Sequence, residues 1–110
     1  MIYMTEIVDI HEKKLEIKEL FKKTPLLKLN DHYFGLTWME EGYRLHKHDR
    51  DEFFLVLEGH LEIQVGDKVH ELDPFQGILI ETGEPHKSKA SHKTLVGVFE
   101  PQDIGMEFLE

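Results

Sequence analysis

The sequence contains no cysteine among its 110 residues. Disulfides, thiolate nucleophiles, iron–sulfur clusters and cysteine-ligated zinc sites are therefore excluded for this sequence. A reducing compartment is compatible with this absence, and we expect a cytoplasmic protein. The first residues lack a basic segment followed by a long apolar run, so no signal peptide is visible. No apolar stretch approaches the roughly 20 residues that a membrane-spanning helix needs.

Positive charge is also scarce. The 13 Lys and Arg residues face 22 Asp and Glu residues, which gives a formal net charge of −9. A nucleic-acid binder or a protein attracted to anionic membranes needs a basic face, so we expect neither partner. With 40% hydrophobic residues in this length, the chain is typical of one globular domain spanning residues 1–110.

The first 25 residues have the pattern of an arm with one short helix. Asp9 is followed three residues later by Glu12, which is the spacing of a capping box. Apolar residues then recur near helical spacing, and Pro25 interrupts the pattern. The sequence thus predicts a helix over roughly residues 10–22, with a charged, irregular arm as the alternative.

From there to the C-terminus the hydrophobic period changes from that of a helix to that of strands. Gly66-Asp67 separates two alternating segments and is typical of a type II′ hairpin turn. Parallel α/β folds are excluded because no crossover helices separate the short segments. We therefore predict an all-β antiparallel sandwich or barrel over residues 31–100. The expected strands are residues 33–39, 53–57, 61–65, 68–72, 78–80 and 95–99.

Histidine is abundant, with eight residues, and three of them suggest a metal site. His46 and His48 stand two apart, so on a strand both imidazoles point to the same side. Glu52 opens an apolar strand, where a carboxylate is costly to bury without a cationic partner. His86 comes from a separate segment, after the rigid turn Gly83-Glu84-Pro85. For any single one of these histidines, an exposed loop residue is the alternative.

Imidazoles and a carboxylate form a nitrogen and oxygen ligand set. Such a set suits a divalent first-row metal, namely Fe, Mn, Ni, Cu or Zn, and leaves positions open for a substrate or water. We expect one such ion, and the residues do not choose among the five metals.

Two segments resemble the two signatures of the cupin superfamily. They read His46-x-His48-x3-Glu52-x6-Gly59 and Gly83-x2-His86. In cupins these segments bring three histidines and one glutamate onto one metal inside a small antiparallel jelly-roll β-barrel. The resemblance implies that the metal ligands are His46, His48, Glu52 and His86. It also favours a homodimer, because small cupins are often dimeric.

The sequence departs from the cupin pattern near the second signature. Glu81 stands where the family has proline, Phe75-Gln76 replaces its Gly-Asp turn, and Ala90 replaces its asparagine. None of these changes removes a ligand.

Aromatic residues and further histidines are candidates for the surroundings of the metal. Tyr33, Phe34, Trp38, Tyr43 and Phe54 are candidate pocket residues, with barrel core as the favoured alternative for each. His32 is a further pocket candidate. His60 is expected in a turn, His70 on an outward strand face, His92 in a polar loop and His11 on the helix surface. Residues 53–57 are apolar throughout, so both faces of that strand need cover, from a second sheet or a second subunit.

Three functions are consistent with this pattern. The first is a metal-dependent dioxygenase, isomerase or epimerase acting on a small molecule. The second is a small-ligand binding or sensor module without turnover. The third is a structural metal whose positions are all closed by protein. The enzyme is slightly favoured, although no general acid or base beyond the ligands is identifiable.

Overall fold

The computed structural model describes residues 2, 3 and 5–110 and consists mainly of β-strands. One short helical segment precedes them, formed by α1 (Ile10–Lys13) and the 3-10 turn η1 (Lys14–Glu16). No helix among the described residues is long and apolar enough to cross a membrane. The strands are β1 (Thr24–Leu29), β2 (His32–Gly42), β3 (His46–His48), β4 (Glu52–Glu58), β5 (Leu61–Val65), β6 (Lys68–Leu72), β7 (Gly77–Ile80), β8 (His86–Pro101) and β9 (Met106–Phe108).

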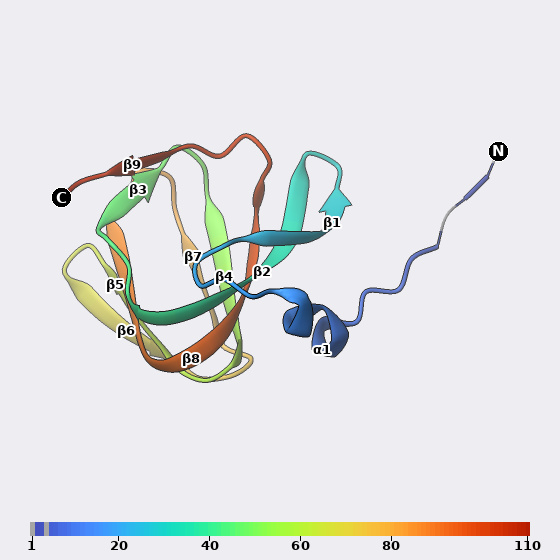
Figure 1. The fold of residues 1–110 in the computed structure, drawn as a ribbon. Helices are drawn as coiled ribbons and strands as arrows, with labels where there is room; N and C mark the ends of the chain where they lie inside the picture. The colour runs from blue at the N-terminus through green and yellow to red at the C-terminus, as the bar shows by residue number, and fades with distance from the viewer. Residues whose placement is uncertain (1, 4) are drawn as a thin grey trace.

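Strand β8 organises the fold because it pairs with four other strands. All four run antiparallel to it: β2 and β4 both pair with its stretch 95–99, while β5 and β3 pair near its beginning at His86. The remaining strands attach at the edges, β1 to β2, β7 to β4, β6 to β5 and β9 to β3. The sheet curls around an interior, as Figure 1 shows, and the predicted all-β antiparallel barrel is confirmed.

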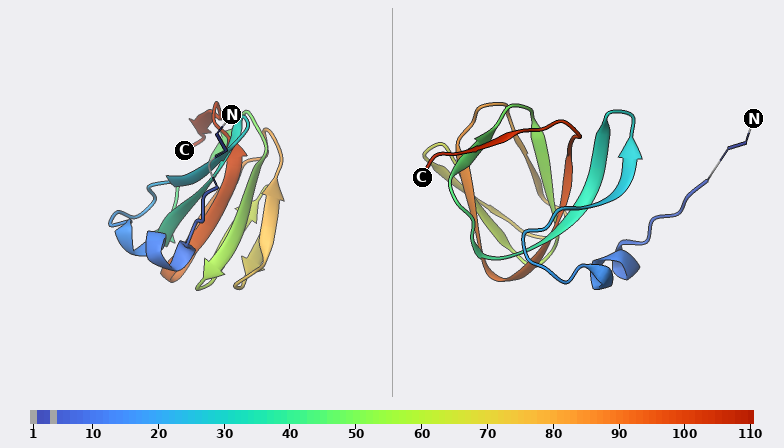
Figure 2. Two further views of the ribbon diagram at one scale, coloured as in Figure 1. Left: turned by 90° about the vertical axis from the view of Figure 1, so that its right-hand side faces the viewer. Right: turned by 45° about the horizontal axis from the view of Figure 1, so that its top comes forward.

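Two hydrophobic clusters lie on opposite faces of the curled sheet. The larger one fills the interior and includes the fully buried Val56, Leu61 and Ile63. The smaller one lies outside the barrel, where Ile17 covers Leu36 and Leu95. Figure 2 shows the N-terminal helical segment packed against the outer face of the sheet. The arm therefore stabilises the barrel by burying a second apolar surface.

The predicted helix over residues 10–22 is too long. The Asp9 side chain does accept a hydrogen bond from the Glu12 backbone N–H, as the capping pattern predicts. Helical structure nevertheless ends at Glu16. Beyond it, Leu20 forms a bridge with Trp38 of β2. Tertiary contacts with the sheet thus override the helical spacing of these residues.

Most expected strands are present, and their boundaries differ where the pattern is weak. Strands β5 and β6 coincide with the predicted ranges, joined by a turn whose first residue, Gly66, has a φ of +62°. Strands β1 and β9 lie outside the range 31–100. His92, predicted in a loop, lies within β8, which begins at His86 rather than at residue 95.

The outer face of β4 is only partly covered. Leu57 packs against the outer cluster, but Phe53 is 37% exposed, and its cross-strand neighbour Leu79 is exposed as well. Among the described residues of one chain, no second sheet covers Phe53, so cover by a second subunit stays a prediction.

Candidate metal centre

Three histidines come together inside the barrel through the pairing of β3 with β8. His46 lies directly opposite His86 in the ladder, and His48 follows on the same face of β3. The ring centroids of His46 and His86 are 4.2 Å apart, and those of His46 and His48 are 4.9 Å apart. All three residues are buried, and one ring nitrogen from each lies within 4.8 Å of the others. This cluster could hold a metal ion.

Backbone carbonyls fix the orientation of all three rings. The Nδ1 atom of His46 lies 2.6 Å from the carbonyl oxygen of Arg44, and that of His86 lies 2.9 Å from Glu84 O. The Nδ1 atom of His48 lies 3.0 Å from Gly105 O, in the segment that leads into β9. Since a carbonyl only accepts, each Nδ1 carries the proton and donates. Each Nε2 then keeps its lone pair free for a metal.

The free ring nitrogens of His48 and His86 face Glu52. The Glu52 Oε1 atom lies 3.4 Å from His48 Nε2 and 3.7 Å from His86 Nε2. Within the described part of the chain, all three atoms are buried and have no hydrogen-bond partner. Orphaned polar atoms are costly to bury, and a cation among them would satisfy all three at once. The donor set therefore fits a borderline divalent metal.

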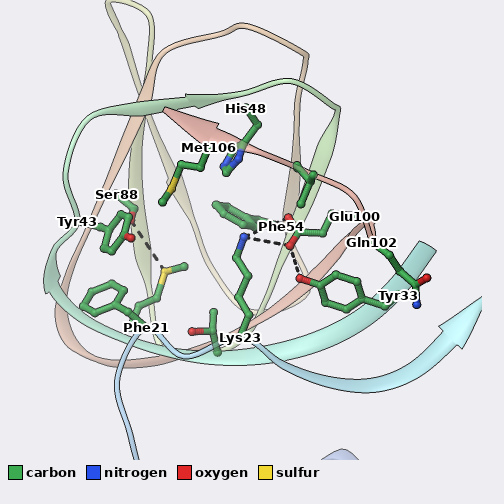
Figure 3. A pocket seen from close by; sticks show the side chains of 13 residues that line it. Phe21, Lys23, Tyr33, Tyr43, His48, Phe54, Ser88, Glu100, Gln102 and Met106 are labelled. Atoms are coloured by element: carbon green, nitrogen blue, oxygen red, sulfur yellow. Dashed lines mark hydrogen bonds and ion pairs between the residues drawn. The ribbon is translucent and has the colours of Figure 1, made fainter. Parts of the chain in front are cut away.

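Beside this cluster, Lys23 bridges two buried carboxylates. Its Nζ atom lies 2.9 Å from Glu52 Oε2 and 3.1 Å from each carboxylate oxygen of Glu100. The Tyr33 hydroxyl donates a hydrogen bond to Glu100 Oε1. Figure 3 shows Lys23 rising from the chain before β1 toward Glu100, with Tyr33 on the far side of that carboxylate. Glu52 thus has the cationic partner that its burial requires.

The pKa values of the histidines differ within the cluster. Burial lowers the pKa of His46 to about 4, so its imidazole is neutral at pH 7 and able to coordinate. Burial also acts to lower the pKa of His48, but the adjacent Glu52 carboxylate outweighs it and raises that pKa above its ordinary value. In the metal-free protein, His48 therefore binds a proton more readily than His46 does.

The two carboxyl groups that Lys23 contacts, those of Glu52 and Glu100, have different surroundings and different pKa values. Burial acts to raise the pKa of Glu52, but the neighbouring His48, His86 and Lys23 hold it well below its usual range. Burial and the proximity of Glu52 raise the pKa of Glu100 to about 7. Burial acts to lower the pKa of Lys23, yet the two carboxylates raise it, so Lys23 stays a cation. Lys23 therefore contacts one ionised carboxylate, Glu52, and one carboxyl group, Glu100, that is close to half protonated at pH 7.

A cavity of about 410 Å³ opens beside the histidines and the charged network. Aromatic and methionine residues form six of its 13 lining residues, and polar residues, among them His48 and Glu100, form another six. The aromatic and methionine residues of the walls are Phe21, Tyr33, Tyr43, Phe54, Met39 and Met106. The buried hydroxyl of Thr37 lines the cavity as well and lacks a partner within the described residues. The space accommodates a small organic molecule.

The structure sorts the sequence-predicted pocket candidates into two groups. Tyr33, Tyr43 and Phe54 line the cavity, although barrel core was the favoured alternative for each, and Phe54 also belongs to the interior core cluster. Phe34 and Trp38 instead pack against the outer cluster, because they lie on the opposite face of β2.

The remaining histidines stay away from the cluster. His32 stacks on Phe99 with centroids 5.4 Å apart and does not line the cavity, so its candidacy is wrong. His11 lies on the helix surface, as predicted. His60 follows Gly59 at the end of β4, and its ring contacts Asp73 and Glu71. It takes no part in the metal cluster.

Sequence reasoning missed Lys23, Glu100 and the contribution of β9. The sequence does contain an indication for Glu100. Val96, Val98 and Glu100 alternate on the inward face of β8, and a charged residue in such a position stands out. Lys23 has no such signal, because its role depends on how the chain before β1 crosses the sheet. Gly105 supplies a carbonyl to His48 through backbone geometry alone.

Known proteins share both the fold and the sequence pattern. The Cupin_2 model of the cupin domain matches residues 39–98. The uncharacterised protein YdbB of Bacillus subtilis is 34% identical over 82 residues, which is 73% of each chain. The crystal structure of a cupin-2 domain protein from Shewanella frigidimarina superposes with a TM-score of 0.85 at 27% identity, covering 87% of this chain and 95% of that one.

More distant structures share the fold alone. Hydroquinone 1,2-dioxygenase PnpCD, solved with Cd²⁺ and 4-hydroxybenzonitrile, superposes with a TM-score of 0.73 at 12% identity. That match covers 93% of this chain and 79% of the dioxygenase chain.

Residues 39–98, which match the cupin-domain model, include the three clustered histidines and Glu52. The match to the cupin-domain model, the strand topology and the similarity to YdbB together show that the chain belongs to the cupin superfamily.

Proposed function

We propose that this cupin is a metal-dependent enzyme, a dioxygenase or an isomerase, that acts on a small organic molecule. The proposed ligands of one divalent Fe, Mn, Ni, Cu or Zn ion are His46, His48, Glu52 and His86. The observation that carries the proposal is the convergence, beside a cavity, of three buried atoms that have no hydrogen-bond partner among the described residues: His48 Nε2, His86 Nε2 and Glu52 Oε1. A bound divalent metal supplies a Lewis acid with positions open to substrate.

The cavity walls favour an apolar, ring-sized substrate. Four aromatic rings and two methionines surround the space, and such surfaces pack well against a planar molecule. Among the described residues, Lys23 is the one Lys or Arg that lines the cavity, and two carboxylates already engage it. A phosphorylated sugar would find no free cationic side chain there. The dioxygenase is therefore preferred over an isomerase of sugar phosphates, and PnpCD, which holds a phenolic ligand on the same fold, supports this choice.

Residues of this chain would hold and enclose such a substrate. The rings of Tyr43 and Phe54 would contact its faces, and the buried Thr37 hydroxyl would hydrogen-bond to a polar substituent. Glu100, with its pKa near 7, would hold or release a proton at the cavity wall.

Elemental analysis of the untagged protein, purified without chelator, tests the proposal first. The expected result is about one equivalent of a first-row metal per chain. Iron would be followed by oxygen-consumption assays with small phenols and hydroxybenzoates, and the expected result is substrate-dependent uptake that His86→Ala abolishes. Absence of metal, even after soaking with each of the five ions, would refute the proposal.

A non-catalytic ligand-binding or sensor module is the second candidate, because the same cavity can hold a small molecule without converting it. Ligand binding by the metal-loaded protein with no oxygen uptake and no exchange of substrate protons would establish this function. If the metal had no exchangeable water, as relaxation measurements would show, a structural role would replace both candidates.

An exposed apolar surface on the outside of the barrel favours self-association. The exposed pair Phe53 and Leu79, beside Leu55 and Phe99 on neighbouring strand positions, forms an apolar outer surface. We propose that a second copy of the chain covers it, forming a homodimer. Light scattering should give twice the chain mass, and Phe53→Glu should give the monomer.

A cytoplasmic location stays a prediction, which cell fractionation tests.

A further inference from the structure

Lys23 reaches the metal centre from a short strap, Leu20–Lys23, between the helical segment and β1. The strap is fixed to β2, since the Phe21 backbone N–H donates to Trp38 O at 2.8 Å and Leu20 bridges the same residue. Phe21 adopts a positive φ of +58°, an uncommon conformation outside glycine. These contacts direct the side chains of Phe21 and Lys23 into the cavity wall.

The two oxygens of the Glu52 carboxylate have different surroundings. Oε2 accepts a hydrogen bond from Lys23 Nζ at 2.9 Å. Oε1 is buried, has no partner among the described residues and faces the free Nε2 atoms of His48 and His86. The carboxylate is therefore held by one oxygen while the other points toward the histidine cluster.

Lys23 is itself anchored by a second carboxylate, that of Glu100. Both oxygens of Glu100 lie 3.1 Å from its Nζ, and Tyr33 holds Glu100 in turn. Glu52 and Glu100 are each about 1% exposed, so these contacts are formed away from bulk water. The Lys23 ammonium, which has these three oxygen atoms as acceptors, is held in place by two buried carboxylates.

We infer that Lys23 is a positioning residue that makes Glu52 present a single oxygen, Oε1, to a metal held by the three histidines. The inference rests on the proposed ligand set. Hydrogen-bonded partners of metal ligands orient those ligands, and their loss typically weakens metal binding by about 10- to 100-fold. Without Lys23, Glu52 Oε2 would be buried without its donor, and the carboxylate would be free to rotate or to offer both oxygens.

The test compares Lys23→Met with the matched control Lys14→Met. Lys14 also belongs to the N-terminal arm and pairs with a carboxylate, Glu58, at 2.8 Å, but it does not line the cavity. Metal-free proteins are titrated with Co²⁺ against a competing chelator, and the visible spectrum of bound Co²⁺ reports its coordination. Lys23→Met should weaken Co²⁺ affinity about 10-fold or more and change the spectrum. Lys14→Met should leave both at parental values.

Two results would overturn the inference. Parental affinity and spectrum in Lys23→Met would show that Glu52 needs no positioning. A rise in Co²⁺ affinity would show that Lys23 acts only as a repelling charge. If circular dichroism shows that Lys23→Met does not fold, Lys23→Gln compared with Lys14→Gln replaces it, with the same expected direction.

A Glu52→Ala background separates this inference from the proposed ligand set. If Lys23 acts through Glu52, adding Lys23→Met to Glu52→Ala should change Co²⁺ affinity little beyond the single Glu52→Ala variant. If Glu52→Ala itself leaves affinity unchanged, Glu52 is not a ligand and the proposed four-ligand set fails. If Glu52→Ala weakens binding but Lys23→Met does not, the ligand set stands and the positioning role alone fails.

Discussion

Two regions of this protein place histidine beside carboxylates, and they differ in what the ring nitrogens contact. In the candidate metal centre, each histidine Nδ1 donates to a backbone carbonyl, and the Nε2 atoms of His48 and His86 have no partner within the described residues. On the surface, both nitrogens of His60 contact carboxylates, Asp73 at 2.8 Å and Glu71 at 3.3 Å.

This difference separates a histidine that is available as a candidate metal ligand from one that is held as a cation. Hydrogen bonds with Asp73 and Glu71 raise the pKa of His60, which favours the protonated ring and leaves no lone pair for a metal. Burial of His46 favours the neutral ring, with its lone pair available. Proximity of histidine to carboxylate is therefore a poor indicator of a metal site. A better indicator of a metal site is a histidine whose one ring nitrogen donates to a backbone carbonyl while the other has no partner.

The largest expected effect comes from removing a clustered ring. His46→Ala and His86→Ala should each lose most of the bound metal, because each removes one of the proposed ligands. His60→Ala should keep the parental amount, since its ring lies outside the cluster. Mass spectrometry of the metals in the purified proteins measures this. Equal metal content in all three variants would contradict the site assignment.

Acidification should weaken metal binding in two stages. The proton competes with the metal at His48, whose pKa is raised, so affinity should fall first as the pH drops from about 7 toward 6. His46, with its pKa of about 4, should resist protonation until the pH approaches that value. Chelator competition at a series of pH values measures the loss, with His60→Ala as the control that follows the parental curve. Affinity that stays constant between pH 7 and 5 would count against histidine coordination.

A substitution at Gly59 should have a smaller effect, which changes the stability of the fold and leaves metal binding unchanged. Gly59, next to His60, has a φ of +90°, and a Cβ there would lie 2.5 Å from Thr94 Oγ1. Gly59→Ala should lower the free energy of unfolding by about 2 kcal/mol through backbone strain and overlap. Denaturant unfolding measures this loss. Metal bound per folded chain should stay at the parental value, and a drop would indicate that the two regions are coupled. Gly66→Ala is a control for positive φ without overlap, because nothing lies within 4 Å of its added Cβ.

The smallest expected effect concerns the charge of His60. Asp73→Asn should lower the pKa of His60 toward its ordinary value, because the largest contribution to the upward shift is the hydrogen bond with Asp73. A histidine with a raised folded pKa stabilises the fold below its unfolded pKa, and this stabilisation disappears as the pH rises through the folded pKa. Nuclear magnetic resonance titration of the ring protons measures the shift. The same pKa in both proteins would show that Asp73 does not hold the ring.

The sequence predicted the features that repeat locally. Strands β5 and β6 and the turn at Gly66-Asp67 follow from alternation and from glycine at the first turn position, and the structure confirms both strand ranges. Local chemistry was sufficient in these segments because the determining contacts lie within a few residues or one hairpin.

Prediction was weaker where distant segments compete for the same residues. Residues 17–21 have near-helical spacing, yet Ile17 is buried against Leu36 and Leu95 of the sheet. The pocket candidates divide in the same way, since Trp38 faces the outer cluster and Tyr33 the cavity. Spacing assigns residues to faces, but only the packed sheet decides which face encloses the cavity.

By itself the sequence determined the strand pattern, the family and three histidines of one cluster, because these depend on the order and type of residues along the chain. The tertiary structure alone decided that Lys23 and Glu100 meet Glu52, and that Gly105 O fixes the ring of His48. Lys23 and Glu100 are 77 positions apart. Their meeting depends on how the strap and β8 pack around one interior, and the burial of both carboxylates there makes the ammonium between them necessary.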